Sequence, residues 1–320
     1  MALTEKALIA EIRTMARVRG SRGVLAGIGD DCAVLRTPPG HDVLVTTDFS
    51  LEGVHFRREW HPAESVGHRC LTRGLSDIAA MGGDPVAAFL SLALPRDVPQ
   101  AWVTKFTRGL LRLAREHGVP LAGGDTAESP HGILADIVVV GSVPKGEAVT
   151  RSGARPGDRI CVSGLLGGSA AAVKQMEAGQ KLKPREWEQH FYPEPRLAMG
   201  RVLREKGLAS AMIDVSDGLS TDLAHICEES GVGAEISLDA IPLASVGKRA
   251  GEVDLDLALH GGEDYELLFT VPSAKRIPQQ VAGVPISQIG CITRRRKIFA
   301  VDPDGASKEL RPRGWEHFRS

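Results

Sequence analysis

The chain has 320 residues, of which 42% are hydrophobic and 25% are charged, and its formal net charge is -1. This length predicts about two domains with cores of their own, and the composition is that of an ordinary globular protein. The near-zero charge excludes recruitment to nucleic acid or to an acidic membrane by a general positive field.

The first half of the chain alternates helical and strand patterns. Periodicity predicts helices over 3–18, 63–81 and 99–117, and apolar runs predict strands over 43–47, 86–94 and 133–143. The segment 144–158 is rich in glycine, proline and charge, which indicates a boundary. We therefore expect an N-terminal α/β domain over 1–147 and a C-terminal α/β domain over 148–320.

The second half repeats the mixture of helices and strands. Its pattern predicts strands at 159–164, 211–215, 233–238 and 265–271, helices at 164–176 and 217–230, and a closing hairpin. The basic run 294–297 lies between two apolar segments, which favours a solvated hairpin tip over a nucleic-acid patch. The fold class is mixed α and β.

Cysteine usage and the chain start indicate the compartment. No two of the five cysteines form a CxxC pair or a zinc spacing: Cys32, Cys70, Cys161, Cys227 and Cys291. All lie in or next to apolar segments, which predicts buried free thiols in a reducing cytoplasm. The first 15 residues include acidic ones and lack the long apolar core of a signal peptide. No apolar run reaches the roughly 18 residues of a membrane span.

Six segments place carboxylates beside glycine or at a strand end. They are GIGDDCAVL (27–35), LVTTDFSLEGVHF (44–56), GLSDIAAMGG (74–83), LAGGDTAESP (121–130), IDVSDGL (213–219) and HGGEDYELLF (260–269). Taken singly, each has a structural explanation. Asp30 could belong to a turn, and Asp77 could form an exposed salt bridge with Arg73. Asp125 could cap a helix or a turn. One of Asp214, Ser216 and Asp217 suits a helix N-cap.

Taken together, these carboxylates favour a metal site. If Asp30, Asp48, Asp77, Asp125, Asp214 and Asp217 converge, their repulsion requires cations, and the all-oxygen donors suit Mg²⁺ or Mn²⁺ rather than zinc or copper. Several such ions with few basic residues suggest a polyphosphate substrate. A P-loop and the protein-kinase signatures are absent, and Cys32 replaces the third glycine of GxGxxG. The residues alone therefore predict metal-dependent phosphoryl transfer to an open acceptor.

In this order, the motifs GIGDDCAVL, TTDFSLEGVHF, GLSDIAAMGGDPVAAFLSLALP, GGDT, DVSDGLSTDL and GGEDYELLF closely resemble those of the thiamine-monophosphate kinase family. That family belongs to the superfamily of aminoimidazole ribonucleotide synthetase and selenophosphate synthetase. The resemblance runs from about residue 24 to Trp315. It implies ATP-dependent phosphorylation of thiamine monophosphate to thiamine diphosphate. It also implies two α/β domains in a homodimer, the N-terminal domains pairing into a β-barrel and the C-terminal domain covering the site.

The resemblance also assigns site residues. The implied Mg²⁺ ligands are Asp30, Thr46, Thr47, Asp48, Asp77, Asp125, Asp214 and Asp217. The implied ATP contacts are Gly124, Asp125, Arg151 and Ser216. The implied substrate contacts are His55, Glu263 and Trp315. Several Mg²⁺ ions per site and ATP as co-substrate follow, with no nucleic acid and no membrane as partner.

The acceptor of this implied reaction is a phosphate that is already deprotonated near neutral pH. We therefore expect neither a general base nor a covalent nucleophile, and direct in-line transfer. Two alternatives stay open: another ATP-dependent synthetase of the superfamily, and a non-catalytic nucleotide-binding scaffold. The first cysteine is Cys32, so the reactive N-terminal cysteine of a selenophosphate synthetase is absent. A scaffold predicts gaps in the ligand set, and the sequence shows none.

Overall fold

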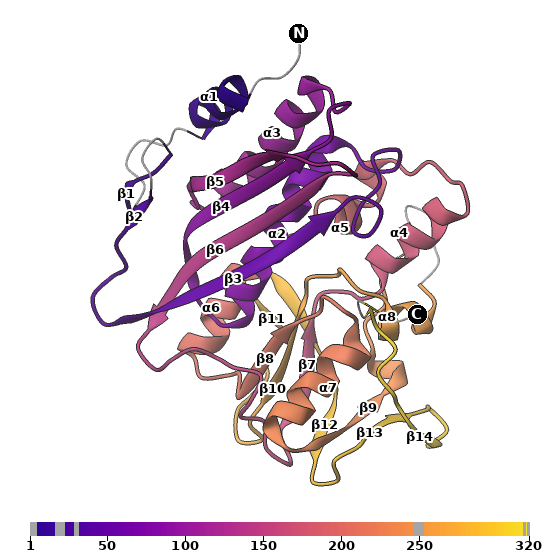
Figure 1. Ribbon diagram of the computed structural model, residues 1–320. Coiled ribbons are helices and arrows are strands. Elements are labelled where there is room, and N and C mark those ends of the chain that lie inside the picture. The colour runs from indigo at the N-terminus through magenta and orange to yellow at the C-terminus, as the bar shows by residue number, and fades with distance from the viewer. Residues whose placement is uncertain (1–4, 17–22, 29–31, 246–252, 316–317, 319–320) are drawn as a thin grey trace. The chain divides into compact units, whose positions relative to one another are not determined.

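The computed structural model describes residues 5–16, 23–28, 32–245, 253–315 and 318, and the chain forms two compact units (Figure 1). The N-terminal unit comprises Met1–Ile78 and Gly83–Gly146, and the C-terminal unit comprises Ala79–Gly82 and Glu147–Ser320. In the described part of the chain, no helix is both long enough and apolar enough to cross a membrane.

A four-stranded sheet with helices on one face forms the N-terminal unit. Its elements are α1 (Glu5–Met15), β1 (Val24–Ala26), β2 (Val34–Leu35), β3 (His41–Leu51), α2 (Ala63–Ala80), β4 (Asp84–Leu94), α3 (Gln100–Glu116), β5 (Leu121–Glu128) and β6 (Leu134–Pro144). The strand order is β3-β6-β4-β5, with β4 and β5 parallel and the other pairs antiparallel. The sequence patterns predicted α2, α3, β4 and β6 to within two residues at each end.

Helix α2 packs closely on β6 and on α3. A Cβ added at Gly74 would lie 2.5 Å from the Val139 Cγ2, and one added at Gly67 would lie 1.9 Å from the Phe106 carbonyl oxygen. Only glycine allows the backbones to approach this closely. The helix thereby covers the face of the sheet that carries the buried residues Ala135, Ile137 and Val139 of β6.

The opposite face of this sheet is open within the chain. On β3, Val43, Val45 and Phe49 are 54%, 67% and 51% exposed. Strand residues alternate between the two faces, so these three lie on the side away from α2. Three large apolar side chains exposed on one face of a long strand favour an interaction site over an ordinary solvent face.

The C-terminal unit contains a larger sheet packed against α7. Its elements are β7 (Arg159–Ser163), α4 (Gly168–Glu177), η1 (Pro184–Glu186), α5 (Glu188–Phe191), α6 (Leu197–Glu205), β8 (Ala211–Asp214), α7 (Leu219–Ser230), β9 (Gly233–Ser237), η2 (Leu238–Ala240), α8 (Leu255–His260), β10 (Leu267–Val271), β11 (Gln280–Val281), β12 (Val284–Thr293), β13 (Ile298–Val301) and β14 (Ser307–Glu309). The strand order is β14-β13-β9-β12-β7-β10-β8, and β11 pairs with β12. Leu219, Leu223 and Ile226 of α7 belong to the core of this unit.

Two sequence interpretations are wrong here. The apolar segments around the basic run 294–297 do not form a hairpin, because β9 lies between β12 and β13, antiparallel to the first and parallel to the second. Cys32 and Cys291 are exposed, whereas the other three cysteines are buried and all five are free. Cys291 lies opposite the exposed Glu235 on β9, so it faces solvent although its neighbours along the chain are apolar.

Candidate functional site

The run Thr46-Thr47-Asp48 divides between the two faces of the N-terminal sheet. The Thr46 hydroxyl donates to an Asp77 carboxylate oxygen on α2. The Thr47 hydroxyl points to the other face and donates to the Asp136 Oδ1 on β6 at 2.7 Å. Because residues of a strand alternate between its faces, Thr46 points toward α2 and Thr47 points away from it.

Asp48 lies beside a buried cation. Its Oδ1 is 3.7 Å from the Arg73 Nη1 on α2, and Arg73 is only 8% exposed. The expected solvent-exposed salt bridge of Arg73 is therefore wrong, because α2 turns this residue toward the sheet. A guanidinium cannot lose its proton, so Arg73 supplies a fixed positive charge beneath the Asp48 carboxylate.

Asp125 and Asp136 lie on the open face of the sheet, on either side of Ser91. Ser91 of β4 is opposite Asp136 on one side and opposite Asp125 on the other. Directly opposed residues point to the same face, so Thr47 and both carboxylates share that face. The cap expected for Asp125 is wrong, because this residue lies inside β5. Sequence reasoning missed Asp136, whose only signal is a single carboxylate within an apolar strand.

A cavity of about 530 Å³ adjoins Asp125 within the N-terminal unit. Its walls are mainly apolar and come from α1, β4, β5 and the segment after β1. They include Ile9, Ile12, Phe89, Leu92, Leu121, Gly124, Asp125 and Thr126. Gly124, at φ 145°, approaches β4 so closely that a Cβ there would be 1.8 Å from the Leu90 carbonyl oxygen. The cavity is therefore mostly apolar, and the Asp125 carboxylate is part of its lining.

His55 belongs to the turn after β3. Its Nδ1 accepts the N–H of Leu51 at 3.0 Å, and its carbonyl oxygen accepts from Arg69. An accepting Nδ1 places the proton of the neutral ring on Nε2. Asp30 lies outside the described residues.

In the C-terminal unit, a buried carboxylate shapes the turn between β8 and α7. The Asp222 Oδ2 accepts the N–H groups of Ser216, Asp217 and Gly218 at 3.2, 3.2 and 3.0 Å. Burial raises the pKa of Asp222 well above its ordinary value, and the neighbouring Asp214 and Asp217 raise it further. Sequence reasoning missed Asp222, because a residue inside a helix gives no sign of which turn it closes.

Asp217 also belongs to a group that could hold a cation. The ligand atoms of Asp217, Asp222 and His225 lie within 4.8 Å of one another. Asp214 lies at the end of β8 and is 3% exposed. The crowding of carboxylates around this turn favours a bound cation, since each acidic neighbour opposes the ionisation of the others.

The GGEDYELL segment lies directly beside this turn. The N–H of Glu263 donates to the Ser216 carbonyl at 2.8 Å, and the N–H of Tyr265 donates to the Val215 carbonyl at 2.9 Å. Glu263 and Tyr265 have φ values of 66° and 52°, which side chains other than glycine seldom adopt. Such strain is retained where the surroundings impose it, commonly at functional sites.

The chain end and Arg151 complete the predicted set. The N–H of Trp315 donates to the Asp217 carbonyl at 3.0 Å, while the Trp315 side chain is 53% exposed. About half of Trp315 is therefore accessible to a ligand. Arg151 is exposed, and its neighbour Thr150 accepts the N–H of Met212 on β8, two residues before Asp214.

Comparison with known proteins decides the family. The models of AIR synthase related protein, N-terminal domain, and AIR synthase related protein, C-terminal domain, match residues 29–143 and 155–302. Thiamine-monophosphate kinase of Escherichia coli K12 is 41% identical over 330 aligned positions, which cover 99% of each chain. This chain belongs to the thiamine-monophosphate kinase family.

Solved structures of the thiamine-monophosphate kinase family have the same two-unit fold. Thiamine-monophosphate kinase from Stenotrophomonas maltophilia K279a is 34% identical with a TM-score of 0.81, covering 96% of this chain and 99% of that one. AaThiL complexed with AMPPCP and TMP is 32% identical with a TM-score of 0.78, covering 99% of each chain. The expected two-domain aminoimidazole ribonucleotide synthetase-like fold is therefore confirmed.

The structure brings the predicted residues of this family member together in two groups, one in each unit. In the N-terminal unit, Thr46 meets Asp77, and Thr47 shares a face with Asp125. In the C-terminal unit, backbone contacts join the turn of Ser216 and Asp217 to Glu263 and Trp315. Asp136, Asp222 and Arg73 are additional members that the motifs did not reveal.

Proposed function

We propose that this chain transfers the γ-phosphoryl group of ATP directly to the phosphate of thiamine monophosphate, with Mg²⁺ bound at its acidic groups. Membership in the thiamine-monophosphate kinase family makes it a thiamine-phosphate kinase. The observation that carries the substrate assignment is the likeness, over 99% of both chains, to AaThiL complexed with AMPPCP and TMP.

The donor sets fit magnesium. The N-terminal ligands would be Thr46, Thr47, Asp48, Asp77 and Asp125, together with Asp30, and the C-terminal ligands would be Asp214 and Asp217. All are oxygen donors, the type that Mg²⁺ prefers. Bound Mg²⁺ would offset negative charge on the phosphate oxygens. Hydroxyl donors and Arg73 also partner the N-terminal carboxylates, which limits their mutual repulsion.

The cavity beside β5 supports a nucleotide site in the N-terminal unit. Gly124 and Asp125, both predicted ATP contacts, form part of its wall. Its apolar surface from α1 and β4 suits the face of a purine base. Arg151 would add a fixed cation for the ATP phosphates, and Ser216 would contact ATP from the turn before α7.

The acceptor phosphate needs orientation rather than activation. Its oxygens carry negative charge near neutral pH, so attack requires no general base. His55 would contact the substrate from the turn after β3, and Trp315 would place its half-exposed indole face against the cationic thiazolium. Glu263 would hold the substrate from the strained loop. These residues would place the two phosphates in line, which is the larger part of the work in phosphoryl transfer.

We also propose transfer without a phosphoenzyme, and three buried cysteines agree with it. Burial raises the pKa of Cys70, Cys161 and Cys227 to about 12, which keeps these thiols protonated and unreactive. We further propose a homodimer in which two N-terminal sheets form a barrel. The exposed apolar side chains Val43, Val45 and Phe49 support this pairing, since closure would bury them and remove the free edge of β3.

We propose that the 1–147 domain forms the dimer and makes most of the ATP and metal contacts. The 148–320 domain would contribute substrate contacts. We propose a reducing cytoplasm as the compartment, which the five free thiols support.

One assay tests the substrate and the metal requirement together. ADP release is measured with ATP alone and with ATP plus thiamine monophosphate, before EDTA, after EDTA and after restored Mg²⁺. We expect release only with acceptor and metal together. Full activity in EDTA would contradict the metal assignment, and equal release without acceptor would contradict the substrate. Exchange of label between ADP and ATP without acceptor would contradict direct transfer.

A further inference from the structure

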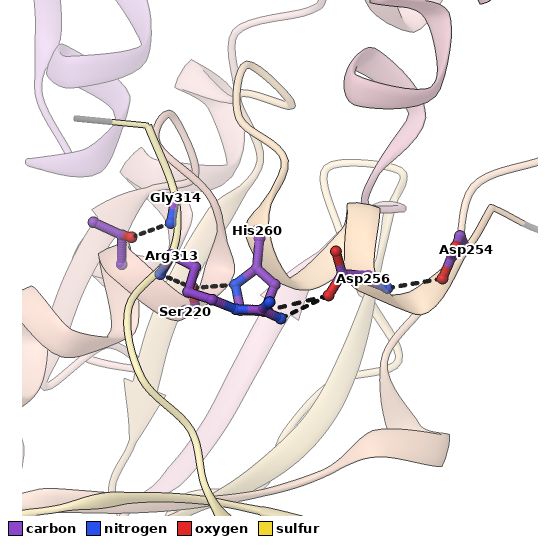
Figure 2. A network of polar contacts seen from close by, with 7 residues as sticks. Ser220, Asp254, Asp256, His260, Arg313 and Gly314 are labelled. Carbon is purple, nitrogen blue, oxygen red and sulfur yellow. Dashed lines mark hydrogen bonds and ion pairs between the residues drawn. The ribbon is translucent and has the colours of Figure 1, made fainter. Parts of the chain in front are cut away.

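The chain end that carries Trp315 is fastened to the start of α7 through its backbone. The N–H groups of Arg313 and Gly314 donate to the Ser220 Oγ at 3.4 Å and the Thr221 Oγ1 at 3.0 Å (Figure 2). The N–H of Trp315 donates to the Asp217 carbonyl at 3.0 Å. Three successive residues of the tail thus follow the turn that carries the predicted metal and ATP residues.

The Arg313 side chain ties the same tail to α8. Its Nη2 donates to the Asp256 Oδ1 at 2.7 Å, and its Nε and Nη2 lie 3.2 and 2.6 Å from the His260 Nε2 (Figure 2). Asp254 caps α8 by accepting the backbone N–H of Asp256, which orders the first turn of the helix. A single guanidinium therefore connects the tail to both ends of a short helix.

The contacts of His260 determine its protonation state. Arginine can only donate, so Nε2 accepts and the ring proton lies on Nδ1, which donates to the Ser220 Oγ at 2.8 Å. Burial lowers the pKa of His260, Arg313 lowers it further, and Asp256 opposes the shift. A protonated Nδ1 cannot take the Ser220 proton, so these residues form a structural network and not a nucleophilic triad.

Gly314 shows how closely the tail approaches α7. A Cβ added at this residue would lie 2.2 Å from the Asp217 carbonyl oxygen and 2.5 Å from the Thr221 Oγ1. Any side chain there would displace the tail from the turn. The fit of Gly314 and the Arg313 network thus act on one property, the position of Trp315 beside Asp217.

We propose that Arg313 is a positioning residue for the acceptor. Its contacts with His260 and Asp256 hold the tail so that Trp315 lies beside the Asp217 turn. This inference rests on the proposed contact of Trp315 with thiamine monophosphate. An indole held in place before binding loses less conformational freedom when the substrate binds. The contacts of Arg313 therefore strengthen acceptor binding. Arg313 itself touches neither the substrate nor the transferred group.

Steady-state kinetics test the proposal through the difference between the two substrates. Since exposed ion pairs contribute modestly, we expect Arg313→Ala to raise the KM for thiamine monophosphate about threefold to fivefold and to leave the KM for ATP and kcat nearly unchanged. Arg313→Lys keeps a cation but not the fork and should recover part of the loss. Gly314→Ala should reproduce the effect with Arg313 intact. The matched control is Arg108→Ala, which removes an arginine of similar exposure that pairs with Glu64.

A double-mutant cycle separates this inference from the proposed function. Trp315→Ala should raise the KM for thiamine monophosphate about tenfold, and adding Arg313→Ala should raise it no further, since both changes remove one interaction. An unchanged KM in Trp315→Ala would overturn the substrate role of Trp315 and the inference with it. A raised KM in Trp315→Ala with an unchanged KM in Arg313→Ala, or full additivity, would overturn the inference alone.

A spectroscopic measurement gives a readout independent of activity. The chain has four tryptophans, so protein labelled with 5-fluorotryptophan gives one fluorine resonance for each, and Trp315→Phe identifies that of Trp315. We expect Arg313→Ala to shift and narrow the Trp315 resonance while the other three stay in place. A Trp315 resonance unchanged by Arg313→Ala would overturn the inference that Arg313 positions Trp315.

Discussion

Two sets of carboxylates, one on the N-terminal sheet and one at two helix starts of the C-terminal unit, are held in different ways. On the N-terminal sheet, side chains partner three carboxylates: Thr46 donates to Asp77, Thr47 donates to Asp136, and Arg73 lies beside Asp48. At the two helix starts, backbone N–H groups do so. Asp222 accepts three of them at the turn before α7, and Asp264 accepts those of Gly167 and Ser169 at the start of α4.

This difference separates carboxylates that can bind ligands from carboxylates that maintain shape. A hydroxyl can rotate away from a carboxylate at small cost, which leaves the oxygen free for an ion. A buried N–H that loses its acceptor remains unsatisfied, at a cost of about 1–3 kcal/mol. We therefore expect substitutions of the N-terminal acids to reduce turnover, and substitutions of Asp222 or Asp264 to reduce stability first.

The largest effect should follow from Asp48→Asn. Loss of one charged ligand from a phosphoryl-transfer site should lower kcat by about 100-fold or more. Removing one carboxylate from a crowded acidic site would by itself relieve repulsion and would hold or raise the stability without metal. Because the buried Arg73 lies 3.7 Å away, we expect a slightly lower melting temperature instead. Steady-state kinetics and thermal denaturation in EDTA measure both. Asp97→Asn, which alters an exposed pair with Arg58, is the control; near-normal turnover in Asp48→Asn would remove Asp48 from the site.

Asp222→Ala should have the largest effect on stability. Three N–H groups lose their acceptor, so the free energy of unfolding should fall by about 3 kcal/mol, with partial access of water limiting the loss. Asp222→Asn keeps one accepting oxygen and should cost less. Urea denaturation monitored by circular dichroism measures the change. The control is Glu228→Ala on the exposed side of the same helix, expected within about 0.5 kcal/mol of wild type. Equal stability of Asp222→Ala and Glu228→Ala would contradict the structural role assigned to the backbone contacts of Asp222.

The sequence predicted the elements that have strong periodicity. Helices α2 and α3 and strands β4 and β6 carry long apolar repeats that end at glycine or proline, so both type and bounds followed from local pattern. The position of β9 between β12 and β13 did not follow, because strand order depends on contacts between segments far apart in the chain. The short helices α5, α6 and α8 were missed for lack of a pattern long enough to read.

The motifs identify the candidate residues as a set but not their geometry. They brought Asp48, Asp77 and Asp217 forward because each belongs to a segment with glycine or a predicted strand end, although Asp48 lies inside β3 (His41–Leu51). Strand alternation divides Thr46 and Thr47 between two faces, but which of them faces α2 was open until the pairing of β3 with β6 was known. Asp136 and Asp222 lie within regular elements, where an acidic residue gives no local signal of its partners.

Asp264→Asn should change the pH dependence of stability. Burial raises the pKa of Asp264 from 3.8 to about 7, although the N–H groups of Gly167 and Ser169 oppose the shift. Between these values the folded state binds more protons than the unfolded state, so the free energy of unfolding falls as pH rises through this window and levels off above it. The asparagine cannot ionise, so the difference between variant and wild type should move in favour of the variant from pH 4 to pH 7. Parallel urea curves across this range, with Asp304→Asn in the exposed β13–β14 turn as control, measure it. A constant difference would show that Asp264 is ionised throughout.

The smallest effect should follow from Thr47→Val, which tests the side-chain partnering of the N-terminal acids. Valine has nearly the same shape and favours strands, so the change removes the hydroxyl and little else. The lost hydrogen bond to Asp136 is exposed at 2.7 Å, and water can replace the donor. We therefore expect the free energy of unfolding to fall by only about 0.5–1 kcal/mol. Thr46→Val, which removes the donor to Asp77 on the helix side, is the companion variant. A loss in Thr47→Val as large as that in Asp222→Ala would mean that the hydroxyls hold the N-terminal acids as firmly as the backbone holds Asp222, and that they are not free to exchange their partner for an ion.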